Sequence, residues 1–124
     1  MKALLVIDVQ NGLINLGDFK EELSLMENII KDFKGANMPV IFMRHVDDEE
    51  ESGLYRNSDG SELHNSLKDY AEYVIEKQTP SSFYNTELQD TLEKLGVDHV
   101  FITGFNTEFC CLFTAIAAFD RGYT

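Results

Sequence analysis

Residues 2–8 read Lys-Ala-Leu-Leu-Val-Ile-Asp, an unbroken apolar run that ends at a carboxylate. A strand that is buried on both faces, as in a parallel sheet, has this continuous pattern rather than an alternating one. Residues 40–43, Val-Ile-Phe-Met, form a second run of the same kind between Pro39 and Arg44-His45. Residues 73–76 and 99–103 are predicted as a third and a fourth strand.

Helical patterns separate these strands. Apolar residues recur at helical spacing in residues 21–34, which Gly35 follows as a stop, and two further helices are predicted over residues 86–95 and 107–120. Residues 10–12 and 47–60 are predicted as loops, and residues 61–64 as a short helix. This order is typical of a three-layer α/β/α fold with a parallel sheet, so we expect one Rossmann-like domain over residues 1–124.

Charge and composition exclude several classes of partner. The formal net charge of −12 argues against nucleic acid, whose phosphates are also negative. The apolar runs are much shorter than the ~20 residues that span a bilayer, and the first run stops at Asp8, so we expect neither a membrane segment nor a secretory signal. The only two cysteines, Cys110 and Cys111, are adjacent and cannot readily bridge each other, which agrees with a reducing compartment. We therefore expect a cytoplasmic protein that acts on a small molecule.

Chemically useful residues follow the predicted strands. Ligands of open α/β sheets bind beyond the carboxyl ends of the strands, and Asp8, Arg44-His45, Lys77 and Cys110 are all placed there by the sequence. If the last helix starts near Thr107, the Cys110 thiol lies in its first turn, where the helix dipole favours a thiolate. A lysine nearby also lowers a thiol pKa, and a carboxylate can accept and return a proton.

Each of these residues also has a structural explanation. Cys110 can be a small buried apolar side chain, and Cys111 is expected to be core. Asp8 can cap a neighbouring helix, and Lys77 can be solvated. Placement alone leaves these alternatives open.

Five short motifs, in order, narrow the choice. They are Asp8-Val9-Gln10, Arg44-His45, Val74-Ile75-Glu76-Lys77, residues 82–88 (Ser-Phe-Tyr-Asn-Thr-Glu-Leu) and residues 104–110 (Gly-Phe-Asn-Thr-Glu-Phe-Cys). Together they resemble the isochorismatase-like cysteine hydrolase family over nearly the whole chain.

The resemblance implies a catalytic triad of Asp8, Lys77 and Cys110. It also implies a cis peptide between Phe105 and Asn106 that aims backbone N–H groups at an oxyanion. The family's sheet has six strands in the order 3-2-1-4-5-6. This chain would supply strands one to four, in the order 3-2-1-4, and lack the C-terminal strands and helices. Family members are usually homo-oligomers, which we expect here.

We expect no metal and no other cofactor. Family members that are nicotinamidases bind a metal through an Asp-x-His segment and a further histidine, whereas this chain has His45 in Arg-His-Val-Asp and a distant His64. Both histidines are better explained as solvated or hydrogen bonded. The metal-bound nicotinamidase interpretation is therefore disfavoured.

The sequence thus predicts a hydrolase that cleaves a C–N bond of a small amide through a thioester on Cys110. Isochorismatase itself cleaves a vinyl ether without a catalytic cysteine, so the cysteine favours amide chemistry. Phe83 and Phe109, with Phe105, are candidates for the apolar wall of the substrate pocket, although Phe83 and Phe109 fit the core equally well. One alternative is a non-catalytic relative that binds a ligand or a partner. Another is a thiol redox protein, which the lack of a Cys-x-x-Cys pair disfavours.

Overall fold

Four strands form one parallel sheet. A computed structural model describes residues 1–105 and 107–124, with the backbone alone at residues 107 and 108. The strands are β1 (Lys2–Ile7), β2 (Val40–His45), β3 (Tyr73–Lys77) and β4 (His99–Gly104). They pair in the order β3-β2-β1-β4, so the predicted order 3-2-1-4 is confirmed.

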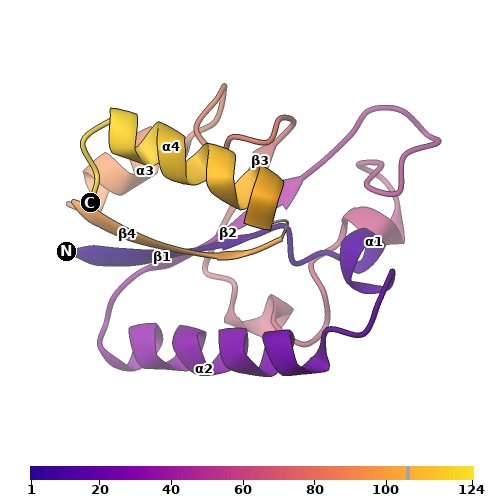
Figure 1. The fold of residues 1–124 in the computed structure, drawn as a ribbon, viewed down its shortest axis with the longest axis horizontal. Coiled ribbons are helices and arrows are strands. Elements are labelled where there is room, and N and C mark those ends of the chain that lie inside the picture. The colour runs from indigo at the N-terminus through magenta and orange to yellow at the C-terminus, as the bar shows by residue number, and fades with distance from the viewer. Residues whose placement is uncertain (106) are drawn as a thin grey trace.

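Helices cover both faces of this sheet (Figure 1). The long helix α2 (Lys20–Gly35) lies on one face, and α3 (Leu88–Lys94) and α4 (Leu112–Asp120) lie on the other. A single turn, α1 (Asn11–Ile14), follows β1, and two 3-10 turns, η1 (Asp59–Ser61) and η2 (Lys68–Tyr70), lie between β2 and β3. A π-helical turn, η3 (Thr107–Cys111), leads into α4. The predicted three-layer architecture is confirmed.

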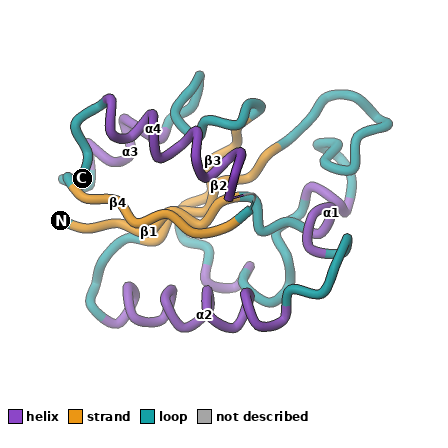
Figure 2. The backbone as a smooth tube through the Cα atoms, in the orientation of Figure 1, coloured by secondary structure: helices purple, strands orange, loops and turns teal. Residues whose placement is uncertain are grey.

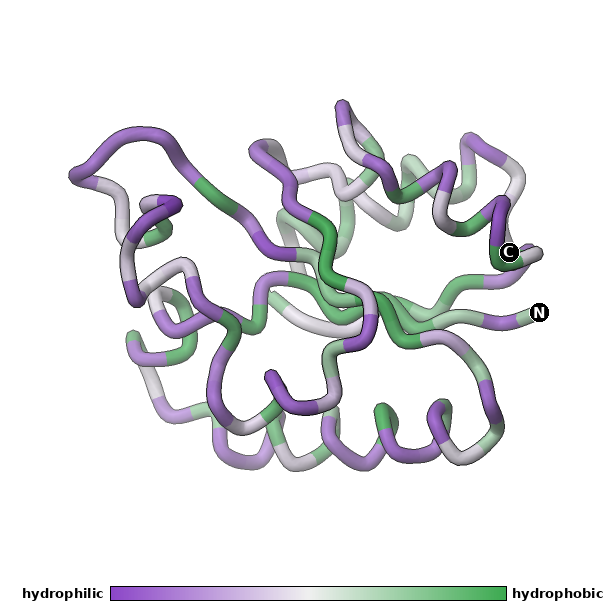
Figure 3. Tube along the Cα trace, turned by 180° about the vertical axis from the view of Figure 1, so that it is seen from behind, coloured by the Kyte–Doolittle hydropathy of each residue, from purple (hydrophilic) through white to green (hydrophobic). Residues whose placement is uncertain are grey.

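The side chains of β1 alternate between two cores. Ala3, Leu5 and Ile7 pack with α3 and α4, whereas Leu4 and Val6 pack with α2. All five are at most 1% exposed, which is why the strand is apolar at every position. The hydrophobic colour in Figure 3 is accordingly concentrated in the middle layer of the fold.

Two local predictions are wrong, and a third is right in its extent but not in its helix type. Residues 10–12 are predicted as loop, but α1 begins at Asn11. Position 12 requires glycine, because a Cβ there would collide with the carbonyl oxygen of Gly53. The short helix predicted over residues 61–64 is a 3-10 turn that ends at Ser61, because Leu63 pairs with Gln10 as an isolated bridge. The last helix does begin at Thr107, but its first turn is π-helical.

The segment between β2 and η1 projects as a loop beyond the carboxyl end of the sheet (Figure 2). Glu76 on β3 forms two ion pairs, one with Arg44 of β2 and one with Arg56 of this loop. Its carboxylate oxygens lie 2.8 Å from Arg44 Nη1 and 2.6 Å from Arg56 Nη1. The loop is therefore attached next to the strand ends where the candidate residues lie.

Among the described residues, no helix combines the length and the apolar character needed to cross a membrane.

Candidate functional site

Asp8, Lys77 and Cys110 come together at the carboxyl end of the sheet. Lys77 Nζ lies 3.1 Å from Asp8 Oδ2 and 3.6 Å from Cys110 Sγ. Asp8 and Lys77 are 1% and 2% exposed, and Cys110 is half-buried. The structure therefore brings an acid, an ammonium and a thiol into direct contact, as their positions at the strand ends predict.

The Asp8 backbone is in the left-handed region. Its φ is 58°, which is uncommon for a residue other than glycine and costs about 1–3 kcal/mol where the surroundings enforce it. Two backbone hydrogen bonds enforce it here: Asp8 N donates to Met43 O, and Gln10 N donates to Asp8 O. The turn directs a carboxylate into the site directly after a buried strand.

One oxygen of this carboxylate has no hydrogen-bond partner. Within the described part of the chain, Asp8 Oδ1 is the buried side-chain polar atom that lacks one. A buried acceptor without a partner costs about 1–3 kcal/mol. Such an atom is available to accept a proton or to bind a substrate group.

Lys77 is held by three short contacts. Besides Asp8, its Nζ lies 3.1 Å from Thr79 O and 3.2 Å from His45 Nδ1. A buried ammonium is tolerated only when it is paired and hydrogen bonded, and both conditions hold here. The solvated alternative for Lys77 is therefore excluded.

The pKa of the Cys110 thiol is raised, contrary to the expectation of a readily formed thiolate. Burial has the largest effect, and the negative charge of Asp8 adds to it. The Lys77 ammonium lowers the pKa but does not outweigh the other two. The isolated thiol is therefore neutral at neutral pH, and an activated form requires a proton acceptor next to it.

Gly104 fixes the path from β4 to Cys110. Its φ is 127°, and a Cβ on it would collide with Ile7 O. The following residue, Phe105, donates its N–H to that same oxygen at 2.9 Å. The close approach of β4 to β1 is thus what brings η3 next to Asp8.

The other predicted site residues lie at varied places. The Phe105 ring packs edge-on against Phe19 at 4.9 Å. Asn106 lies outside the described residues, so the predicted oxyanion contact and cis peptide are not tested. Phe83 is buried in the α3 and α4 core, and Phe109 is exposed and packs on Phe113. Their role in a substrate pocket stays a prediction. Cys111 packs against the core, as predicted, and burial raises its pKa to about 11.

Sequence reasoning missed the role of two polar side chains. Gln10 is fully buried and clamps the end of β2, accepting from His45 N at 2.9 Å and donating to His45 O at 2.7 Å. The ring of His45 contacts Lys77 through Nδ1 and Asp47 through Nε2. The spacing of Gln10 from Asp8 is a visible signal, but the fold alone reveals its partner. His64 is hydrogen bonded to Ser66. Both histidines are therefore hydrogen bonded, which is the explanation that the sequence favours over metal binding.

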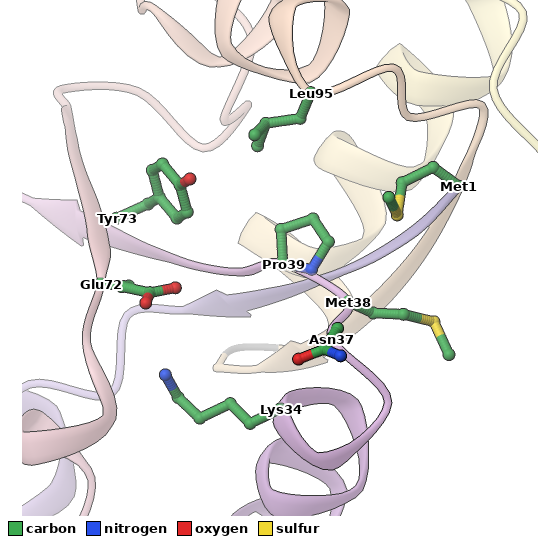
Figure 4. Close-up of a pocket in the computed structure, with 8 residues that line it drawn as sticks. All are labelled: Met1, Lys34, Asn37, Met38, Pro39, Glu72, Tyr73 and Leu95. Carbon is green, nitrogen blue, oxygen red and sulfur yellow. The ribbon is translucent and has the colours of Figure 1, made fainter.

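Two cavities lie at opposite ends of the sheet. One of about 300 Å³ opens beside Lys77, with Arg56, Thr79 and Tyr84 in its wall. The other, of about 340 Å³, lies at the amino ends of the strands (Figure 4). Its charged side chains are Lys34 and Glu72, and none of the three candidate residues lines it. The first cavity adjoins the candidate site because Lys77 lines it. It also lies at the carboxyl ends of the strands, where open parallel sheets bind ligands.

Comparisons with known proteins agree with this fold. A solved structure from Burkholderia xenovorans LB400 superposes with a TM-score of 0.92 and 28% identity, covering 99% of this chain and 62% of that one. N-carbamoylsarcosine amidase from Thermoplasma acidophilum superposes with a TM-score of 0.89 and 28% identity, covering 98% of this chain and 78% of that one. Nicotinamidase 3 of Arabidopsis thaliana is 34% identical over 98% of this chain and 67% of its own length.

The chain therefore spans less than two thirds of the Burkholderia structure. The profile of the Isochorismatase domain matches residues 2–124, nearly the whole chain. The chain belongs to the isochorismatase family.

Proposed function

We propose that this chain carries the catalytic site of a cysteine hydrolase that cleaves the C–N bond of a small amide. Cys110 is the nucleophile, Asp8 the general base and acid, and Lys77 the electrostatic partner of the thiolate. The observation that carries the proposal is the position of the Lys77 ammonium between the Asp8 carboxylate and the Cys110 thiol. The unpartnered Asp8 Oδ1 supplies the proton acceptor that a neutral thiol needs.

The first half of the reaction forms a thioester. Asp8 takes the proton of the Cys110 thiol, and the thiolate is stabilised by Lys77 while Sγ attacks the carbonyl carbon. The backbone N–H groups of Asn106 and Cys110, which the family resemblance implies for this role, are assigned to the oxyanion. The C–N bond then breaks, and the amine leaves with the proton returned by Asp8.

The second half releases the acid. Asp8 takes a proton from water, and the resulting hydroxide attacks the thioester carbonyl carbon. The C–S bond breaks, the acid leaves, and the proton held by Asp8 returns to Sγ. The cycle consumes one water and regenerates the neutral thiol.

The relatives support the choice of bond. Two of them are named as an N-carbamoylsarcosine amidase and as a nicotinamidase. Both names denote enzymes that hydrolyse a C–N bond. N-carbamoylsarcosine and nicotinamide are therefore the first members of a test panel, together with simple primary amides.

Ammonia release from this panel tests the function. We expect the wild-type chain to hydrolyse at least one of these amides and the Cys110→Ala variant to hydrolyse none. The matched control is Cys111→Ala, which removes the adjacent thiol and should stay active. Hydrolysis by Cys110→Ala would refute the mechanism. Absence of turnover in the wild type, with binding of a ligand or partner, would favour the non-catalytic alternative.

A further inference from the structure

The Lys77 ammonium has more neighbours than hydrogens. An ammonium has three N–H donors and no acceptor. Three short contacts, to Asp8 Oδ2, Thr79 O and His45 Nδ1, account for all three hydrogens, and Cys110 Sγ is a longer fourth neighbour. Because Lys77 can only donate, His45 Nδ1 is the acceptor and carries no proton.

The other side of the ring fixes the same tautomer. With Nδ1 unprotonated, the neutral ring carries its proton on Nε2, which lies 3.0 Å from Asp47 Oδ1. Asp47 is itself held, since its Oδ2 accepts from Ser52 Oγ at 2.6 Å. A histidine whose second nitrogen bonds a carboxylate has a fixed tautomer and ring orientation.

The backbone of His45 is equally constrained. Gln10 bonds both its N–H and its carbonyl oxygen, so the backbone of His45 is fixed, while the contacts of the ring with Lys77 and Asp47 set its orientation. His45 is thus a rigid acceptor that points at Lys77 from the end of β2.

We propose that His45, neutral and oriented by Asp47, is a positioning residue that holds the Lys77 ammonium between Asp8 and Cys110. The proposal rests on the proposed hydrolase function, because it assigns His45 a role in that reaction. The ring of His45 hydrogen bonds to Lys77 and Asp47, so in this proposal it acts on the thiol through Lys77.

A proton on Nδ1 would place two cationic groups face to face. The charged and titratable groups around the ring are Lys77 from β3, Asp8 from the end of β1, Cys110 from η3, Asp47 from the loop, and Arg44 from β2, which is turned away to Glu76. The group that faces Lys77 at this position must therefore be an uncharged acceptor, which an amide oxygen also is.

Three substitutions separate positioning from packing. In His45→Asn the side-chain oxygen can occupy the place of Nδ1. In His45→Gln the amide reaches the place of Nε2, and His45→Leu supplies neither atom. All three are made in a Cys111→Ala background, so that Cys110 is the only thiol.

The first readout is the rate at which iodoacetamide alkylates Cys110. We expect His45→Leu and His45→Gln to slow it about tenfold at neutral pH, the effect of raising the thiol pKa by about one unit. His45→Asn should remain within about threefold of the parent.

The second readout is the hydrolysis of any amide that the parent turns over. The Leu and Gln variants should have a lower kcat than the parent with little change in KM. The Asn variant should have a kcat close to that of the parent. Equal rates for Leu, Gln and Asn would show a packing role and overturn the proposal, as would a Leu variant that matches the parent. If Leu does not fold, the Asn and Gln pair decides. If no amide is hydrolysed, the proposed function fails, whereas alkylation still tests His45.

Discussion

At Cys110, two charged neighbours act in opposite directions on one thiol. The charge of Asp8 raises its pKa and the ammonium of Lys77 lowers it, while burial raises it most. The thiolate fraction grows as the pH rises through this pKa, so alkylation should have its midpoint above that of an exposed cysteine.

Substitution of the two neighbours should move this midpoint in opposite directions. Asp8→Asn removes a charge that raises the pKa and should shift the alkylation midpoint down. Lys77→Met removes one that lowers it and should shift the midpoint up. Both should reduce amide hydrolysis by about 10²–10⁴-fold, because each removes a group needed in the transition state. An upward shift in Asp8→Asn would contradict the arrangement, and a thermal melt of each variant controls for folding.

The sequence predicts which residues meet in the site, but not how they interact. Asp8, Lys77 and Cys110 each follow a strand, and parallel strands end at one edge, so their proximity is predictable. The direction in which the pKa of the Cys110 thiol shifts depends on burial and on the distance to Asp8, and the sequence contains neither. The tautomer of His45 likewise depends on two contacts made across β2, β3 and the loop.

At the scale of elements, the pairing of β1 with β4 depends on Gly104. A Cβ there would collide with Ile7 O, and a φ of 127° is unfavourable for any other residue. Gly104→Ala should therefore lower the free energy of unfolding by several times the ~1–2 kcal/mol that left-handed backbone alone costs.

Gly96→Ala is the matched control for Gly104→Ala. Gly96 has a φ of 71°, but no atom lies within 4 Å of the place that a Cβ would occupy, so its substitution carries the backbone cost without the collision. Denaturant unfolding of both variants measures the difference. Equal destabilisation would show that the close approach of β4 to β1 is not required.

Elements with a single clear pattern are predictable, and elements set by contacts are not. The unbroken apolar run of residues 2–7 matches a strand buried on both faces. The helical spacing of residues 21–34 matches a helix buried on one face. In contrast, Gly12 looks like a turn residue in the sequence. Its actual role depends on a long-range contact with Gly53, which the sequence does not show. The π-helical start of residues 107–111 has no comparable sequence pattern.

At the scale of the whole molecule, α4 and η3 present an apolar surface. Its exposed side chains are Phe109, Leu112, Phe113, Ile116 and Phe119. A chain of net charge −12 repels its own copies wherever charge is exposed, so this surface is where two copies can meet. We expect the 124-residue chain to self-associate through it, and more strongly at high salt.

Light scattering during gel filtration measures this association. Ile116→Lys and Phe119→Lys should shift the chain toward the monomer. Leu16→Lys is the control, since Leu16 is 81% exposed but lies after α1, away from this surface. A wild-type chain that stays monomeric at its highest attainable concentration and at high salt would contradict the expectation.

The most direct test of the proposed mechanism is the mass of the chain during turnover. The wild-type chain is mixed with each amide of the panel, quenched in acid within the first turnovers, and analysed by intact-mass and peptide mass spectrometry. We predict an added mass equal to the acyl part of the substrate, located on Cys110 and absent from Cys110→Ala. Hydrolysis of an amide with no adduct on Cys110, or with the adduct on Cys111, would contradict the assignment of Cys110 as the nucleophile.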